Sequence, residues 1–250
     1  MNEDKFSAKG SLYSASRPNY PDGLFEYLTE RGILTPQSTA ADIGSGTGIF
    51  SIQLAQTVKT VFAVEPNDSM RRAAKRDCEA FGGRIISVQA SAEHTGLQDG
   101  SVDCVTAAQA FHWFDRQAFR AECRRILKPS GWVVLVWNDR DEASEIIRRS
   151  GEINAQFCHG YRGYSNGMDF SDPQQFADFF KGDFEVRQFE NVLSYDRETF
   201  LGRSLSSSYA PRPGDENYHG YVQALTRLFE EFGGGTVAYP YVTRCYLGRV

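Results

Sequence analysis

The chain has 250 residues and a mass of 28.0 kDa, with 41% hydrophobic and 24% charged residues. This length can bury the core of one domain, and the composition is ordinary for a globular protein. The formal net charge of −5 argues against a nucleic-acid partner and against an anionic membrane surface, because both select basic proteins. We therefore expect no nucleic acid and no membrane among the partners.

The five cysteines are widely spread, with no CxxC pair and no His/Cys cluster at metal-ligand spacing. We expect reduced, mostly buried thiols and no metal site. The segment Met1–Gly10 is polar and lacks the apolar stretch of a signal peptide. No apolar run approaches the roughly 18 residues that a membrane span requires. Together these features predict a cytoplasmic protein.

Apolar strands alternate with helices over the first part of the chain. Turn residues such as the pair Gly82–Gly83 separate them. Because apolar strands separated by helices form parallel sheets covered on both faces, this region predicts a doubly wound α/β fold. The expected elements are helices over 22–31, 48–55, 69–81 and 116–127 and strands over 40–43, 60–64, 84–89, 102–107 and 132–137.

The chain changes character after residue 138. Runs rich in Val, Tyr and Phe predict strands over 184–194 and 237–247, and helices are expected over 142–157, 197–209 and 218–232. We therefore predict a single domain, residues 1–250, built on a mostly parallel seven-stranded sheet. Its core comprises residues 22–138, 184–194 and 237–250, and the segments 139–183 and 195–236 are helical insertions that cap it.

The most informative motif is the run Ala41–Phe50, ADIGSGTGIF. Its three glycines, at every second position, follow an apolar strand and open a helix, and such a turn lets a ligand approach bare backbone. A nicotinamide or flavin fingerprint, GxGxxG, requires a glycine or alanine where this chain has Ile49. Asp42, beside the turn, suits a ligand with a cationic ammonium group.

A second acid points to a nucleoside ligand. Glu65 ends the second predicted strand, where a carboxylate accepts hydrogen bonds from both hydroxyls of a ribose. The site therefore favours a ligand with an unmodified ribose, a cationic amino-acid-like end and close contact with backbone. S-adenosylmethionine has all three features.

Four segments of the chain, 41–50, 61–70, 87–105 and 107–114, resemble the successive motifs of class I S-adenosylmethionine-dependent methyltransferases. The tract AAQAFHWF at 107–114 is similar in particular to the trans-aconitate-methyltransferase-like group of small-molecule enzymes, as is YSASRPNYP at 13–21. The resemblance covers most of the chain and is looser over 138–183. It implies a Rossmann-like methyltransferase fold and an S-adenosylmethionine-dependent methyltransferase.

The resemblance also implies the residues of the cofactor site. Glu65 matches the ribose-binding acid, and Gln109 and Ala110 match positions beside the transferable methyl group. Ser91 stands where many family members have an aspartate, which puts one acid contact to the adenine in doubt. The full set implied for the cofactor is Arg17, Asp42, Gly44, Ser45, Gly46, Gly48, Glu65, Pro66, Met70, Ala92, Glu93, Gln109 and Ala110.

The expected reaction is methyl transfer from a sulfonium by in-line displacement, in which the protein aligns the nucleophile and excludes water. The predicted acceptor is a small molecule with a carboxylate, a phenol or a similar group. A carboxylate needs no general base, and no catalytic residue is assigned. Candidate residues of the substrate pocket are His112, Trp113, Trp137, Tyr209 and Arg212, of which Arg212 could fix a carboxylate.

Two properties of the tract 109–112 bear on the substrate. It lacks the Pro-Pro of enzymes that methylate exocyclic base nitrogens, which disfavours a nucleic-acid acceptor. His112 has an ordinary pKa of about 6.5, which suits a general base, but we favour a packing role at the entrance of the following helix.

Two alternative functions stay open. An NAD-dependent oxidoreductase is disfavoured by Ile49 and by the absence of a recognisable Tyr-x-x-x-Lys pair. A non-catalytic module that binds S-adenosylmethionine or S-adenosylhomocysteine is compatible with the same motifs, because this chemistry needs no obligatory catalytic side chain.

Overall fold

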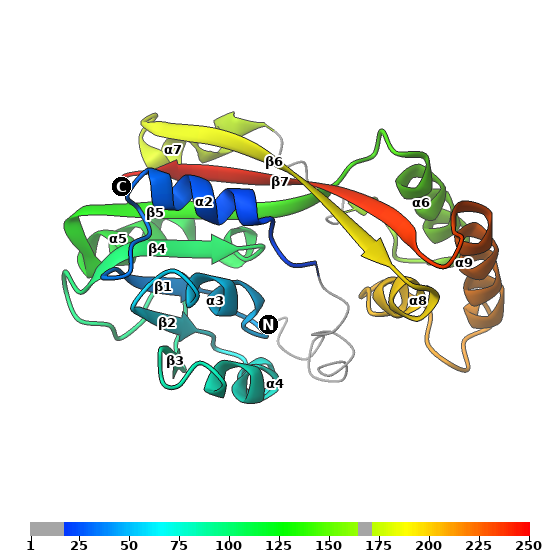
Figure 1. Ribbon diagram of the computed structural model, residues 1–250, viewed down its shortest axis with the longest axis horizontal. Helices are drawn as coiled ribbons and strands as arrows, with labels where there is room; N and C mark the ends of the chain where they lie inside the picture. Colours follow the sequence, from blue (N-terminus) through cyan, green and yellow to red (C-terminus); the bar gives the residue numbers. More distant parts are fainter. Residues whose placement is uncertain (1–17, 165–171) are drawn as a thin grey trace.

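The computed structural model describes residues 18–164 and 172–250, which form a sheet-based core with a helical lobe at one end (Figure 1). The strands are β1 (Thr39–Ile43), β2 (Thr60–Val64), β3 (Ile85–Val88), β4 (Val102–Ala108), β5 (Leu127–Arg140), β6 (Phe184–Tyr195) and β7 (Val237–Gly248). They form one seven-stranded sheet in the order β3-β2-β1-β4-β5-β7-β6. Only β7 runs antiparallel to its neighbours, so the predicted mostly parallel α/β sheet is confirmed.

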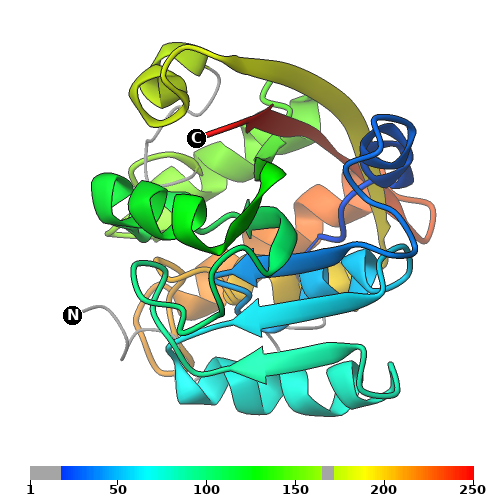
Figure 2. The same cartoon turned by 90° about the vertical axis from the view of Figure 1, so that its left-hand side faces the viewer.

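Helices cover both faces of the sheet, as the end-on view shows (Figure 2). One face carries α2 (Asp22–Glu30), α3 (Ile49–Leu54) and α4 (Asp68–Glu79), and the other carries α5 (Arg116–Ile126), η4 (Pro173–Phe176) and α7 (Ala177–Phe180). Apolar side chains at helical spacing, such as Leu24 and Leu28 of α2, are fully buried against the first face. Each face therefore has its own hydrophobic cluster, and the sheet lies between the two.

The structure differs from the sequence prediction most in β5, which was expected over 132–137 only. Leu127 pairs with Val102 directly after α5, and a register shift separates that pair from the pairing of Trp132 with Cys104. At its other end the strand continues to Arg140. It does so because β7 pairs with it beyond the end of β4. This distant antiparallel partner left no local signal in the sequence.

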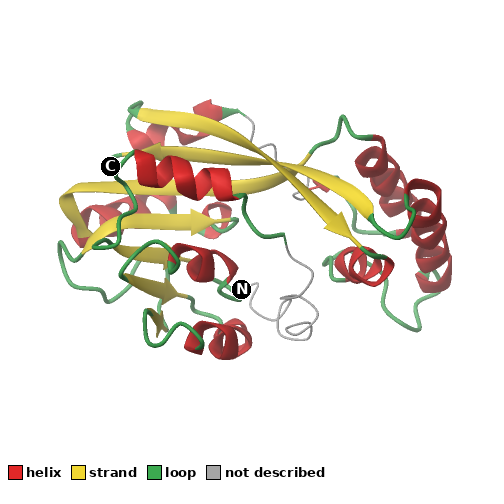
Figure 3. Ribbon diagram, in the orientation of Figure 1, coloured by secondary structure: helices red, strands yellow, loops and turns green. Residues whose placement is uncertain are grey.

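Beyond the sheet core, β5, β6 and β7 extend into the helical lobe (Figures 1 and 3). The lobe contains α6 (Glu145–Phe157), α8 (Arg197–Leu205) and α9 (Tyr218–Phe232). A third hydrophobic cluster, which includes the fully buried Ile147, Tyr221 and Leu225, fills its interior. Because the lobe has its own packed interior, it can hold polar side chains in defined positions where it joins the long strands.

The cysteines are free thiols, four of them buried and Cys78 half-buried, so the prediction of mostly buried thiols is confirmed. Residues 18–164 and 172–250 contain no helix with the length and apolar composition of a membrane span. Within the same ranges, no group of three or more His, Cys, Asp or Glu side chains could hold a metal ion.

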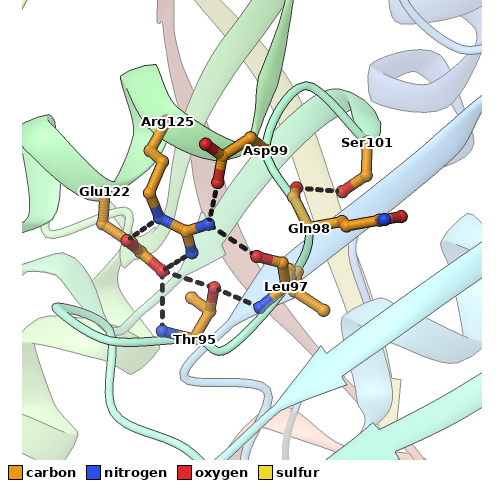
Figure 4. Close-up of polar contacts among 7 residues, drawn as sticks. All are labelled: Thr95, Leu97, Gln98, Asp99, Ser101, Glu122 and Arg125. Carbon is orange, nitrogen blue, oxygen red and sulfur yellow. Dashed lines mark hydrogen bonds and ion pairs between the residues drawn. The ribbon is translucent and has the colours of Figure 1, made fainter.

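A buried carboxylate fastens the loop after β3 to α5 (Figure 4). Glu122 Oε1 accepts hydrogen bonds from Thr95 N at 2.7 Å, from Thr95 Oγ1 at 2.5 Å and from Arg125 Nη2 at 2.7 Å. Arg125 also donates to Asp99 and to the carbonyl of Leu97. Burial alone would raise the pKa of Glu122, but the hydrogen bonds from Arg125 and Thr95 lower it to about 2.

Replacing Glu122 with glutamine (E122Q) is expected to lower the free energy of unfolding by up to about 3 kcal/mol at neutral pH. The folded-state pKa of about 2 lies below the ordinary 4.5, so this stabilisation is complete above pH 4.5 and decreases as the pH falls toward 2. Urea denaturation of both proteins at about pH 7 and about pH 3 measures the effect. The difference in unfolding free energy between the wild type and E122Q should be smaller at the lower pH. A difference that does not change with pH would contradict the stabilising role of the ionised Glu122 carboxylate.

The matched control for this test is Glu152→Gln on α6. The Glu152 side chain is 61% exposed and pairs with the exposed Arg148. Its replacement is expected to change the unfolding free energy by less than about 0.5 kcal/mol at either pH.

Candidate functional site

The glycine turn lies at the carboxyl end of β1, where the strand order reverses between β1 and β4. Open α/β sheets bind ligands at such a position. Gly44, Gly46 and Gly48 have φ angles of 69°, 56° and 83°, in the left-handed region that favours glycine. A Cβ on Gly44 would lie 2.6 Å from the Cβ of Ala110, and one on Gly48 would lie 2.9 Å from the sulfur of Cys78. Backbone conformation and close packing therefore both require glycine at Gly44 and Gly48.

A cleft of about 130 Å³ opens beside this turn. Four residues expected from sequence line it, namely Asp42, Gly44, Ser45 and Gln109. The other lining residues are Pro18, Tyr20, Thr47, Ile49, Phe50 and Ala108. Most of the added residues belong to the motifs already recognised, since they stand between the glycines, at the start of α3 or in the segment 13–21. These additional lining residues could therefore have been predicted from their positions within the sequence motifs.

Asp42 lines the cleft but is only 1% exposed. One of its oxygens accepts a hydrogen bond from Ser51 Oγ at 2.5 Å and the other accepts one from Thr106 Oγ1 at 3.0 Å. Burial raises the pKa of Asp42 to about 6 against the effect of these hydrogen bonds, and the charge of Glu65 adds to the rise. None of the ion pairs among the described residues includes Asp42. A buried carboxylate without a counter-ion favours a cationic group on a ligand.

Glu65 follows β2 and is 8% exposed. Its Oε2 accepts a hydrogen bond from Gly46 N at 3.0 Å, and its Oε1 accepts one from Asn67 N at 2.8 Å. The acid expected to bind a ribose thus lies directly against the glycine turn, next to the cleft rather than in its lining. In this position it ties the end of β2 to the turn after β1.

Pro66 directly follows Glu65, and Met70 lies in the first turn of α4. Met70 is buried, and its N–H donates to Asn67 Oδ1, which caps the helix. Pro66 is exposed. Neither residue lines the cleft, so both flank the site on the side of β2.

Ala92 and Glu93 follow β3. Ala92 is 6% exposed and belongs to the hydrophobic cluster under α5. The Glu93 carboxylate accepts a hydrogen bond from Asp115 N at 3.0 Å, which ties its loop to the start of α5. Arg17, the remaining residue expected at the cofactor, lies outside the described residues.

Gln109 directly follows β4 and has a conformation that is uncommon for a residue with a side chain. Its φ is 58°, in the left-handed region. Its Nε2 donates to the carbonyl of Asn138 at 3.1 Å, and its N–H donates to that of Val136 at 2.8 Å. Ala110, the next residue, is buried against Gly44. A strained residue held by two hydrogen bonds at the edge of a cleft is typical of a functional position.

His112 and Trp113 form the short helix η2 (Phe111–Trp113) with Phe111. Burial lowers the pKa of His112 to about 4, so the imidazole is uncharged at neutral pH and is a weak base. Trp113 is 57% exposed, with its ring centroid 4.9 Å from that of His112. These properties fit a packing role for His112 better than proton transfer.

Trp137, which was expected to line a substrate pocket, lies among packed aromatic rings and outside the lining of the cleft. Its side chain is fully buried, with its ring centroid 6.3 Å from that of Phe111, 5.1 Å from that of Phe176 and 5.8 Å from that of Tyr246. Phe176 belongs to η4, an element that was not expected from the sequence. Phe176 of this element packs against the Trp137 ring and covers it.

The remaining two pocket candidates, Tyr209 and Arg212, are in the helical lobe. Tyr209 is half-buried, and its ring lies 5.0 Å from that of Tyr161. Arg212 is exposed in the loop before α9, where its N–H donates to Asp215 Oδ2 at 2.7 Å. The structure therefore brings Tyr209 into a group of aromatic side chains and leaves Arg212 at the surface.

The sequence of this chain is similar to those of known methyltransferases. Residues 41–135 match the family described as a methyltransferase domain. An uncharacterized methyltransferase-like protein of Schizosaccharomyces pombe is 33% identical over 151 residues, which is 58% of this chain and 56% of that protein. An uncharacterized methyltransferase of Mycobacterium tuberculosis is 33% identical over 148 residues, which is 59% of this chain and 58% of that protein. The alignment thus spans little more than half the length of these curated relatives.

Solved structures extend the comparison over nearly the whole chain. A protein of Anaeromyxobacter dehalogenans, named as a candidate type II methyltransferase, has a TM-score of 0.66 and 27% identity, and the match covers 93% of this chain and 97% of that one. The sheet and its helices therefore have the Rossmann-like methyltransferase fold. The match of residues 41–135 and the shared fold together support a methyltransferase domain in this part of the chain.

Proposed function

We propose that the whole chain is an S-adenosylmethionine-dependent enzyme that methylates a small molecule, as the trans-aconitate-methyltransferase-like group does. The observation that carries the proposal is the pair of acids at the glycine turn. Asp42 is buried and has no counter-ion among residues 18–164 and 172–250, and Glu65 lies against Gly46. A ligand with an ammonium group and ribose hydroxyls suits both acids, whereas a pyrophosphate would be repelled by them.

In the proposed enzyme the cofactor supplies the electrophilic methyl group. Asp42, Gly44, Ser45 and the following glycines would hold its methionine part, and Glu65 would accept hydrogen bonds from the ribose. Pro66, Met70, Ala92 and Glu93 would surround the adenine, and Gln109 and Ala110 would stand beside the reacting methyl group.

The protein would contribute alignment of the acceptor and exclusion of water. The low pKa of His112 argues against strong base catalysis, so the acceptor we favour is a group that is already nucleophilic, such as a carboxylate. We also propose that the segments 139–183 and 195–236 form the cap that binds this acceptor, because they supply α6, α8 and α9 of the helical lobe.

Calorimetry with S-adenosylmethionine, S-adenosylhomocysteine and NAD tests the cofactor assignment. We expect both sulfur ligands to bind and NAD not to bind. Tight binding of NAD alone would overturn the proposal in favour of an oxidoreductase. A turnover screen with S-adenosylmethionine over carboxylic acids, phenols and amines then tests catalysis. Good cofactor affinity without turnover on any of them would favour a binding module.

A further inference from the structure

Two arginines meet tyrosine rings where the helical lobe joins the long strands. Arg140 ends β5, and Arg203 lies in α8 and is 9% exposed. The guanidinium carbon of Arg140 lies 4.1 Å from the ring centroid of Tyr164. That of Arg203 lies 5.1 Å from the ring centroid of Tyr239 and 5.4 Å from that of Tyr241. Tyr239 and Tyr241 interact electrostatically with both guanidinium groups, so the two positive charges share one aromatic environment.

Neither arginine has a carboxylate partner in the described part of the chain. None of the ion pairs found there includes Arg140 or Arg203. Arg140 Nε is buried without a hydrogen-bond acceptor among those residues, and Arg203 Nε donates to the hydroxyl of Tyr241. By contrast, the part-buried Arg244 is paired with Asp139 at 2.8 Å. Contacts with ring faces compensate only part of the cost of removing a guanidinium from water.

These two charges also affect the pKa of a neighbouring tyrosine. Burial alone would raise the pKa of Tyr239, but the charges of Arg203 and Arg140 lower it by more, so its pKa lies below the ordinary value. The surroundings of the two arginines therefore have a positive potential that favours negative charge.

Strand β5 connects this positive region to the cleft. Gln109, which lines the cleft, donates a hydrogen bond to the carbonyl of Asn138. Arg140 is two residues further along β5, a distance of about 7 Å along the strand. It stands on the same side of the strand as Asn138, because alternate residues of a strand share a face. A small molecule can span that distance.

We propose that Arg140 and Arg203 bind an oxyanion of the methyl acceptor, at a group other than the one that is methylated. This inference rests on the proposed methyl transfer and names the acceptor as an anionic small molecule. Guanidinium groups present paired N–H donors that match the oxygens of a carboxylate or a phosphate. The surrounding tyrosines would pack against the apolar part of the same molecule.

The inference is tested by calorimetry on the full chain saturated with S-adenosylhomocysteine, with benzoate, phenyl phosphate and the neutral benzamide as probes. We expect at least one of the two anions to bind, and benzamide to bind at least tenfold more weakly. R140Q and R203Q should each weaken anion binding about tenfold or more. The matched control is R197Q, since Arg197 lies in the same helix α8 but is exposed. This variant should bind the probes as the wild type does.

The relative affinities of benzoate and phenyl phosphate distinguish a carboxylate from a phosphate as the natural group. If neither anion binds, or if R140Q and R203Q bind as tightly as R197Q, the inference is overturned. If both variants fail to fold, probe binding to the wild-type protein still tests the inference. Benzamide binding as tight as that of the anions would contradict a site that selects its ligand by charge. Failure of S-adenosylhomocysteine to bind would instead count against the proposed function, whatever the anions do.

Discussion

Replacing Glu65 with alanine (E65A) is expected to weaken S-adenosylhomocysteine binding by about 2–4 kcal/mol, or about 30- to 1000-fold. The proposed site loses the carboxylate that accepts hydrogen bonds from the ribose. It also loses the hydrogen bonds to Gly46 N and Asn67 N that hold the glycine turn against the end of β2. Calorimetry on the purified variant measures the change in affinity.

Two further variants separate the roles of Glu65. Glu65→Gln keeps one oxygen acceptor and should retain part of the affinity. Glu79→Ala removes a carboxylate from α4 whose side chain is 65% exposed, and it should bind like the wild type. An E65A protein that binds S-adenosylhomocysteine within about twofold of the wild type would remove Glu65 from the cofactor site.

Replacing Trp137 with alanine (W137A) is expected to lower the free energy of unfolding by about 3–5 kcal/mol. The indole is fully buried among Phe111, Phe176 and Tyr246, so its removal leaves a cavity that packed neighbours fill only in part. Urea denaturation measures the loss of stability. Well below the midpoint of thermal unfolding, the affinity for S-adenosylhomocysteine should stay close to that of the wild type.

The matched control is Trp113→Ala, because Trp113 is the same residue type but 57% exposed. Its replacement should cost less than about 1 kcal/mol. The conservative W137F variant distinguishes packing from contact with an acceptor. A W137F protein of near wild-type stability with a strongly altered KM for an acceptor would show that the indole touches substrate after all.

The parallel part of the fold and the glycine turn were predictable from sequence because their signals are local. The strands β1 and β2 are short, mostly apolar runs between helices, and such runs indicate a buried parallel sheet. The glycines of the turn need backbone angles that few other residues adopt, so their spacing is visible in the sequence. The same holds for Glu65, whose position follows from where β2 ends.

The environment of the aromatic and charged side chains was less predictable, because it depends on contacts between distant segments. Trp137 was expected at an open edge and is covered by Phe176, 39 residues later in the sequence numbering. Arg140 was not singled out, since nothing in its neighbourhood shows that β7 extends β5 to that point or that α8 brings Arg203 close. Arg212, which was singled out, lies at the surface.

The sequence alone determines the doubly wound sheet, the glycine turn at the end of β1 and the two acids beside that turn. These features follow from backbone conformation and short-range patterns. Which side chains are buried, and which charges lack partners, depends on how β5, β6 and β7 carry the helical lobe beyond the sheet. That assembly leaves Arg140 and Arg203 without carboxylates in the described part of the chain, because burial and charge pairing are properties of the packed molecule.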